Sequence, residues 1–297
     1  MPRAEKNPAD APMSVRVVEP VFFPDLSERR ALKLASVHRY VARAHFGTWI
    51  ARTGRPDFTR LAGIFTPLVH VEFAVTDLPL ETTTKLRIAG QSRLARVLDA
   101  QGGLRHLARE GLWKVTTLDG REVGRARMVN VFTRYDTDPA RRRVTELPPE
   151  LGVGPLPSHV IEVPTLEDLV PPGRAADVRE GITRAWHYAE TDPNRHVNGM
   201  AYLRSLEDFL ANALHSQGHD LSRLYETRVR LVYRKPCFRG ESYHRFAWCR
   251  GEAPLVMTAA VLGADAAEGA RPAMAAELTF GLHDEETADH AAAGKGE

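Results

Sequence analysis

The sequence contains few cysteines. Of its 297 residues only Cys237 and Cys249 are cysteine, which is too few for a disulfide framework and lacks the paired spacing of a zinc site. The twelve histidines also show no metal-ligand spacing. We therefore expect no metal, no cofactor, and a reducing, cytoplasmic setting.

Long apolar runs and an excess of one charge are also missing. No stretch approaches the roughly 18 apolar residues of a membrane span, and the N-terminus lacks the apolar core of a signal peptide. The 40 basic residues against 38 acidic ones give a net charge of only +2. Because this charge creates no strong overall field, we expect no nucleic-acid binding, and the missing apolar runs lead us to expect no membrane protein.

The length and composition predict two globular domains. The chain is 43% hydrophobic and 26% charged, which is enough to build a core in each of two domains of about 130 to 150 residues. Eight prolines fall between residues 139 and 172, where they disfavour a helix or a central strand. We expect domains at 15–138 and 181–283, a linker at 139–180, and disordered tails at 1–14 and 284–297.

Both expected domains show the same order of elements. In the first, residues 14–23 predict a strand and residues 27–50 predict a helix, whose apolar residues Leu34, Val37, Val41 and Ala44 recur at helical spacing. Further strands are expected at 68–75, 83–90, 112–118 and 123–135, with a hairpin turn at Asp119 and Gly120.

The second domain repeats this plan. A strand is expected at 183–190 and a helix at 199–215, with Leu203, Leu206, Leu210, Ala213 and Leu214 on one face. Strands are then expected at 227–234, 242–250, 254–263 and 273–282. The sequence therefore predicts an α+β protein in which a long helix is wrapped by an antiparallel sheet, twice.

A short polar segment joins the strand and helix of the second domain. It reads Asp192-Pro193-Asn194-Arg195-His196-Val197-Asn198-Gly199. This segment resembles the D-x-N-x-H-V-N-N active loop of hot-dog acyl-acyl carrier protein (ACP) thioesterases, with Gly199 departing from the last Asn. Asp192 also matches the catalytic aspartate of 4-hydroxybenzoyl-CoA-type thioesterases. The resemblance covers residues 183–281 and implies a tandem double hot-dog protein, whose units pair as single-unit relatives do when they dimerise.

The residue types of this segment suit thioester hydrolysis. Asp192 can activate water or attack the carbonyl, while Asn194 and His196 can hold the substrate and the water. If Asn198 or Gly199 begins the helix, free backbone N–H groups there can stabilise an oxyanion. Capping of the helix by Asp192 to Asn194 is the structural alternative for the same polar residues.

A second segment bears on the same chemistry. Tyr233-Arg234-Lys235-Pro236-Cys237 resembles the family's Y-R-R-E-C strand, but Pro236 replaces the acidic residue to which a catalytic part has been assigned. Either the reaction proceeds without that acid or another carboxylate replaces it. Cys237 could be a nucleophile beside His196, although a lone strand cysteine is more often a buried apolar residue.

Basic residues cluster around that strand. Arg230, Arg234 and Lys235, together with Arg228 and Arg239, could bind an acidic carrier protein or the phosphates of coenzyme A. A solvated strand face is the alternative. The first domain has no counterpart of the polar segment, since residues 23–28 contain neither His nor Asn. One site per chain follows.

The leading interpretation is an acyl thioesterase. Its substrate would be a fatty or polyketide acyl thioester of acyl carrier protein or coenzyme A, and two double hot-dog chains could form a homodimer. A hot-dog dehydratase acting on 3-hydroxyacyl thioesters is one alternative. A non-catalytic acyl- or carrier-binding module, suggested by Pro236, is the other.

Overall fold

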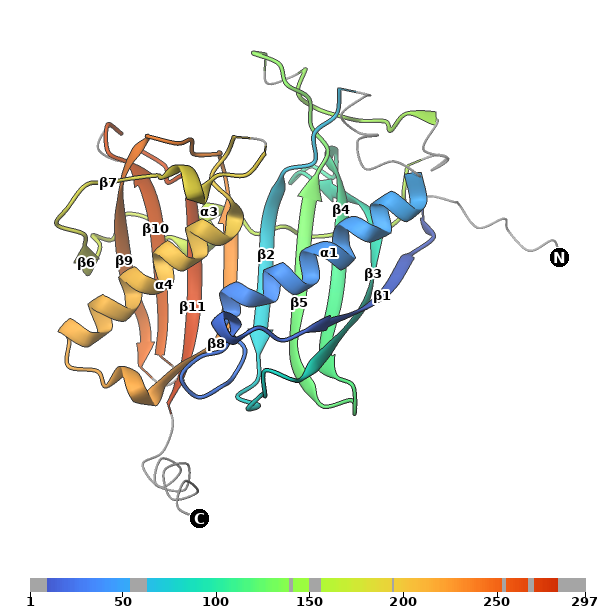
Figure 1. The fold of residues 1–297 in the computed structure, drawn as a ribbon. Helices are drawn as coiled ribbons and strands as arrows, with labels where there is room; N and C mark the ends of the chain where they lie inside the picture. Colours follow the sequence, from blue (N-terminus) through green and yellow to red (C-terminus); the bar gives the residue numbers. More distant parts are fainter. Residues whose placement is uncertain are drawn as a thin grey trace. The chain divides into compact units, whose positions relative to one another are not determined.

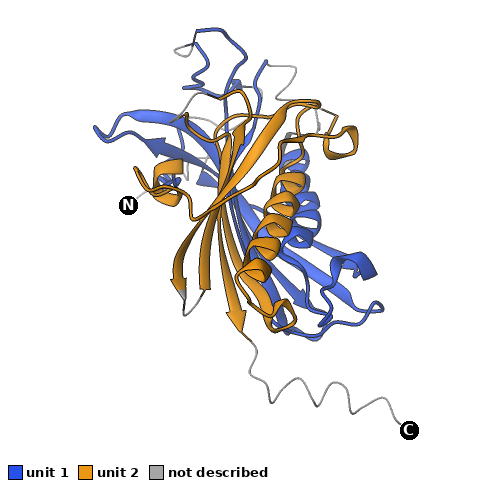
Figure 2. Ribbon diagram, turned by 90° about the vertical axis from the view of Figure 1, so that its left-hand side faces the viewer, with its two compact units in different colours: residues 1–164 blue, residues 165–297 orange. Residues whose placement is uncertain are grey.

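The computed structural model describes residues 10–53, 63–138, 141–149, 156–193, 195–252, 255–266 and 270–282. The chain divides into two compact units, Met1–Pro164 and Thr165–Glu297, which Figure 2 colours separately. The division lies inside the segment 139–180 that the sequence predicts to be a linker. Residues 1–9 and 284–297 of the expected tails lie outside the described residues, whereas Met13 and Ser14 belong to the first strand.

Unit 1 is a long helix packed on an antiparallel sheet. Its elements are β1 (Met13–Pro20), the 3-10 turn η2 (Phe23–Asp25), α1 (Leu34–Thr53), β2 (Leu68–Val75), β3 (Lys85–Leu98), β4 (Leu104–Thr117) and β5 (Glu122–Val131). The strands are ordered β1-β3-β4-β5-β2, and α1 contacts β1, β2, β3 and β5 (Figure 1). The predicted apolar stripe of the helix, Leu34, Val37, Val41 and Ala44, is fully buried, as expected.

Unit 2 has the same plan. Its elements are α3 (Leu166–Leu169), β6 (Val178–Arg179), β7 (Arg184–Ala185), the 3-10 turn η4 (Tyr188–Glu190), α4 (Gly199–Ser216), the 3-10 turn η5 (Leu221–Arg223), β8 (Leu224–Tyr233), β9 (Ser242–Glu252), β10 (Leu255–Gly263) and β11 (Met274–Leu282). The strands are ordered β8-β11-β10-β9-β6, with β7 also paired to β9. All five predicted core residues of α4 are buried.

The first helix starts later than the sequence predicts. The expected start at Ser27 is wrong, because the chain makes a tight loop before α1: the Ser27 N–H donates to the Ala31 carbonyl oxygen over 2.8 Å, and Leu26 and Leu32 form an antiparallel bridge. Arg30 in this loop has φ 66°, which no right-handed helix allows. The predicted turn at Asp119 and Gly120 is confirmed between β4 and β5.

Two predictions in unit 2 are also wrong. Only Arg184–Ala185 of the strand expected at 183–190 forms a strand, because its end folds into η4, where the His187 N–H donates to Glu190 Oε2 over 2.6 Å. The Pro-rich segment, expected to exclude helix, contains the single turn α3. The turn fits between Pro164 and Pro171. The Asp168 carboxylate caps it by accepting the Thr165 N–H over 2.6 Å.

Apolar residues anchor the same Pro-rich segment. Ile161 packs in a buried cluster with residues of β3 and β5 in unit 1. Leu166 and Leu169 pack with Val232 and Trp248 in unit 2. The segment is therefore partly built into the two cores. None of the helices in the described part of the chain is both long and apolar enough to cross a membrane.

Candidate active site

The segment from Thr191 to Val197 closes on itself ahead of α4. Thr191 and Val197 face each other in an antiparallel bridge. Within this bridge the Asp192 N–H donates to the His196 carbonyl oxygen over 2.9 Å. The loop thereby brings together the backbones of Asp192 and His196, two of the three residues that the sequence assigns to the chemistry. Asn194, the third, lies outside the described residues.

A left-handed residue allows this tight reversal. Arg195 has φ 64°, a conformation that residues other than glycine adopt rarely. Its N–H donates to the Asp192 carbonyl oxygen over 2.9 Å, and its side chain is exposed. Such strain persists only where the surrounding structure holds it, and functional loops are one place where it occurs.

The loop is fastened to the chain that follows β8. The Val197 N–H donates to the Cys237 carbonyl oxygen over 2.9 Å, and His196 and Phe238 form a second antiparallel bridge. The rings of His196 and Phe238 meet edge to face with centroids 5.1 Å apart. The two segments that resemble the thioesterase motifs, 192–199 and 233–237, therefore lie side by side.

The start of α4 leaves one backbone donor available. The Asn198 N–H donates to the Glu190 carbonyl oxygen over 2.7 Å, and Asn198 Oδ1 caps the helix by accepting the Met200 N–H over 2.8 Å. The Gly199 N–H, between them, has no hydrogen-bond partner among the described residues. Of the two residues proposed for an oxyanion site, Asn198 has its N–H already bonded, whereas the N–H of Gly199 has no partner in the described part of the chain.

Two tyrosines that the sequence reasoning missed hold this helix start in place. The hydroxyl oxygen of Tyr202 accepts the Cys237 N–H over 2.7 Å, and the Tyr233 hydroxyl donates to the Gly199 carbonyl oxygen over 3.2 Å. A Cβ atom at Gly199 would lie 3.1 Å from the Tyr233 hydroxyl oxygen, so this position favours glycine. The sequence signal for Tyr202 is its position four residues after Asn198, which places it one helical turn after the cap and on the same face of the helix.

Two further carboxylates belong to residues bonded to the loop or to the chain that follows Pro236. Glu241 Oε2 accepts the Phe238 N–H over 2.9 Å, and Glu190 Oε2 accepts the His187 N–H over 2.6 Å. Each of these two carboxylates is therefore engaged in holding backbone. Pro236 itself is exposed.

Cys237 is buried, as the more common interpretation of a lone cysteine expects, although it lies after β8 and not in a strand. Burial raises the pKa of its thiol, and this outweighs the hydrogen bond to Tyr202 that lowers the pKa. A raised pKa disfavours the thiolate, which is the nucleophilic form. The environment of Cys237 therefore favours a structural role over nucleophilic attack.

The basic residues around β8 differ in their partners. Arg230 Nε lies 2.9 Å from the Glu277 carboxylate, and Arg234 donates to the carbonyl oxygens of Pro272 and Arg271 over 2.6 and 2.8 Å. Lys235 is exposed. Two of the three residues proposed to bind a carrier are thus engaged within the chain, and Lys235 remains the more accessible one.

Unit 1 uses its corresponding aspartate differently. Asp25, which precedes α1, is buried, and its carboxylate accepts the Tyr40 hydroxyl over 2.6 Å and also a hydrogen bond from Arg39. Those bonds tie the carboxylate into the packing of α1.

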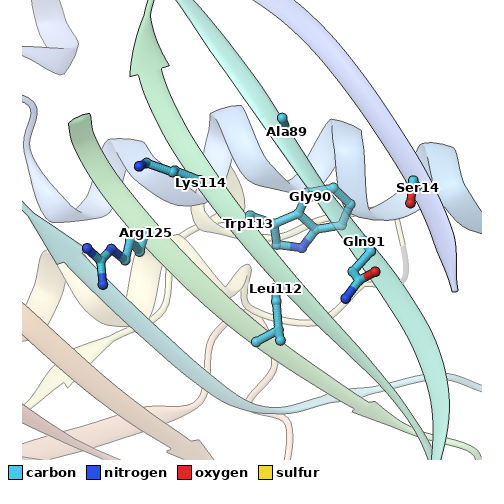
Figure 3. Close-up of a pocket in the computed structure, with 8 residues that line it drawn as sticks. All are labelled: Ser14, Ala89, Gly90, Gln91, Leu112, Trp113, Lys114 and Arg125. Carbon is cyan, nitrogen blue, oxygen red and sulfur yellow. The ribbon is translucent and has the colours of Figure 1, made fainter. Parts of the chain in front are cut away.

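An open depression of about 400 Å³ lies on the sheet of unit 1 (Figure 3). None of the site residues proposed from the sequence contributes to its lining, which consists of Ser14, Ala89, Gly90, Gln91, Leu112, Trp113, Lys114 and Arg125. In the part of the chain that the structure describes, no three His, Cys, Asp or Glu side chains are grouped as a metal site would need.

Solved structures share this architecture along nearly the whole chain. A protein described as an oleoyl thioesterase from Lactobacillus plantarum is 18% identical, with a TM-score of 0.67, over 93% of this chain and 97% of the other. An acyl-ACP thioesterase from Bacteroides thetaiotaomicron is 14% identical, with a TM-score of 0.64, over 94% and 100% of the two chains. The 12:0-ACP thioesterase from Umbellularia californica is 15% identical, with a TM-score of 0.64, over 91% and 95%.

No protein-family model and no curated protein sequence matches the chain. At identities this low, the structural similarity establishes the fold alone. This fold agrees with the helix-on-sheet plan of each unit described above. The chain therefore has the tandem double hot-dog fold of these solved structures.

Proposed function

We propose that this protein hydrolyses an acyl thioester, releasing a fatty or polyketide acid from acyl carrier protein or coenzyme A. The observation that carries the proposal is the loop closed by the Asp192–His196 backbone hydrogen bond, which ends at a helix whose Gly199 N–H is available. Solved structures of the same fold whose names include acyl-ACP thioesterase support it. A cytoplasmic location and pairing of two chains belong to the same proposal.

In this mechanism Asp192 acts as the general base. Its carboxylate takes a proton from a water molecule, whose oxygen forms a bond to the thioester carbonyl carbon. The carbonyl oxygen becomes an oxyanion that accepts the Gly199 N–H, where the partial positive charge at the start of α4 adds to the stabilisation. The carbon–sulfur bond then breaks, and the thiolate leaves with the proton that Asp192 holds. Asn194 and His196 orient the substrate and the water.

The test is turnover of a panel of acyl-CoA and acyl-ACP thioesters by the full chain. Released thiol is followed by absorbance and the acid product by mass spectrometry. Asp192→Asn should reduce thiol release by at least about a hundredfold, as loss of a general base does, while the circular dichroism spectrum stays unchanged. Asp220→Asn is the matched control, because Asp220 is an exposed helix cap in the same unit.

Three results would contradict the proposal. Full activity of Asp192→Asn would remove Asp192 from the mechanism. Loss of water from a 3-hydroxyacyl thioester with the thioester bond intact would indicate a dehydratase. Saturable binding without turnover on the whole panel would indicate a binding module, as the replacement of the family acid by Pro236 suggests.

A further inference from the structure

Polar side chains are buried between α1 and the sheet of unit 1, where a hot-dog unit would be expected to hold only apolar ones. They come from four elements: His45 and Thr48 from α1, Ser92 from β3, Arg109 from β4 and Asn130 from β5, each at most 3% exposed. Thr48 and Ser92 share a hydrogen bond of 3.0 Å. Because buried polar groups are costly unless they are paired, the remaining three need an explanation.

The hydrogen bonds of Asn130 fix the protonation of His45. Asn130 Nδ2 donates to the Thr66 carbonyl oxygen over 2.8 Å, so its Oδ1 faces His45 Nε2 at 2.7 Å and must accept a proton from it. Burial lowers the pKa of His45 well below its ordinary value, so the ring is neutral. His45 Nδ1 is then a hydrogen-bond acceptor, and it has no partner among the described residues.

Arg109 is a buried cation without a carboxylate among the described residues. It is 3% exposed, its Nε has no hydrogen-bond partner, and its guanidinium contacts the faces of Trp49 at 5.4 Å and Phe46 at 5.9 Å. Burial lowers its pKa to about 9, so it stays charged at neutral pH. Contacts with aromatic rings offset only a part of the cost of burying a charge.

Arg245 in unit 2 provides an internal comparison. It is also 3% exposed and also contacts an aromatic ring, that of Phe209 at 5.0 Å. Unlike Arg109, it has a carboxylate, because its Nε donates to Glu180 Oε2 over 2.8 Å. Among the described residues, one buried arginine thus has a carboxylate partner and the other has none.

The neighbouring indole repeats the pattern. Trp113 Nε1 is a buried donor without a partner among the described residues. A Cβ atom at Gly111 would lie 2.6 Å from Trp113 Nε1 and 2.3 Å from His45 Nδ1, so both atoms approach the bare Cα of Gly111. Within the described residues, a cation without a carboxylate, an indole N–H without an acceptor and an imidazole nitrogen without a donor are therefore gathered on the helix-facing side of β4.

We propose that unit 1 binds an organic monocarboxylate, whose carboxylate lies on the Arg109 guanidinium and whose apolar body extends over Phe46 and Ile50. The planar fork of a guanidinium matches a carboxylate, and a single cation beside a neutral imidazole suits one negative charge better than the higher charge of a phosphate. Phe46 and Ile50, four residues apart on α1, are 51% and 41% exposed, which is high for large apolar side chains.

Binding of octanoate to the full chain tests the proposal. Isothermal titration calorimetry should detect octanoate, and its uncharged analogue octanamide should bind at least tenfold more weakly. Arg109→Met should weaken octanoate binding at least tenfold, whereas Arg125→Met should not, because Arg125 has an exposed side chain next to Glu122. Loss of binding in Arg109→Met separates this site from the proposed active site, where octanoate could bind as a product, because Arg109 lies on β4 of unit 1 and the proposed active site lies in unit 2.

Thermal unfolding separates a ligand-binding role from a structural one. Without ligand, Arg109→Met should unfold at the same or a higher temperature than the wild type, because the variant no longer buries an unpaired charge. Arg245→Met should unfold at a lower temperature, since it removes the buried partner of Glu180 and leaves this carboxylate to the half-exposed Arg184 alone. Octanoate should raise the melting temperature of the wild type and not that of Arg109→Met. Equal binding of octanoate and octanamide, binding that survives Arg109→Met, or no octanoate binding to the wild type would overturn the proposal.

Discussion

Gly199 combines two properties that a larger residue would disturb. Its N–H is available at the first position of α4, and the Tyr233 hydroxyl packs against its Cα. With a Cβ at position 199, the nearest atom would be the Tyr233 hydroxyl oxygen at 3.1 Å, and the next the Cζ atom of the same ring at 3.7 Å. The close contact therefore depends on the hydroxyl group alone.

This geometry predicts a rescue. Gly199→Ala should lower kcat by at least about tenfold with little change in KM, because a displaced N–H stabilises the oxyanion less well. Combining it with Tyr233→Phe should restore part of the rate. The hydroxyl oxygen is then absent, and the nearest atom to the new methyl group is the ring Cζ at 3.7 Å, which is an ordinary van der Waals contact. A double-mutant cycle on kcat measures this coupling. Additive effects of the two substitutions would show that the contact does not position the N–H.

Single residues differ in how far the sequence predicts their place. The segment from Asp192 to Gly199 could be found because its polar residues interrupt a strand-to-helix pattern. The buried set around Arg109 was missed, although His45 and Thr48 extend the apolar stripe of Val41 and Ala44 at helical spacing. A polar residue in such a stripe does not by itself indicate a binding role. The hydrogen-bond partners of these side chains depend on how three strands and a helix pack together. A local sequence pattern does not contain that information.

At the scale of elements, the cap of α4 links stability to the site. Asn198 Oδ1 accepts the Met200 N–H over 2.8 Å, which satisfies one of the free donors at the helix start. The same helix start presents the Gly199 N–H. Loosening of this cap would therefore affect both the free energy of unfolding and the position of that donor.

Asn198→Ala should lower the free energy of unfolding by about 1 kcal/mol, the usual cost of losing a side-chain cap. Asn198→Asp is the control, because it keeps an acceptor oxygen and places a negative charge at the positive end of the helix. Urea denaturation followed by circular dichroism gives both values. An equal loss in the two variants would mean that the amide nitrogen of Asn198, and not its capping oxygen, is what matters.

The elements that the sequence predicts correctly have a long, regular pattern. The eighteen residues of α4 carry a complete apolar face, and β2 coincides with its predicted range 68–75. The errors fall where short-range contacts replace a repeat: the loop before α1 and the turn η4 at the end of the predicted strand 183–190. In both segments, one or two specific hydrogen bonds determine the backbone conformation. The spacing of apolar residues does not predict these hydrogen bonds.

At the scale of the whole molecule, the same architecture places two aspartates in different surroundings. Each unit places an aspartate ahead of its long helix, Asp25 in unit 1 and Asp192 in unit 2. Asp25 is buried and bonded to Tyr40 and Arg39, whereas Asp192 lies in a polar loop and is partly exposed. Burial and the hydrogen bond to Asp25 raise the pKa of Tyr40, so this hydroxyl remains a proton donor to Asp25.

Replacing each aspartate by asparagine should therefore separate folding from chemistry. Asp25→Asn should lower the free energy of unfolding by about 1.5 to 3 kcal/mol, because it weakens hydrogen bonds to a charged carboxylate, and should leave kcat within about twofold. Asp192→Asn should do the opposite, with thioester turnover lost and stability retained. Paired measurements of kcat and of chemical denaturation on the same preparations decide the matter. If Asp25→Asn also abolished turnover in protein that remains folded, unit 1 would contribute to the chemistry, and the assignment of one catalytic unit per chain would be wrong.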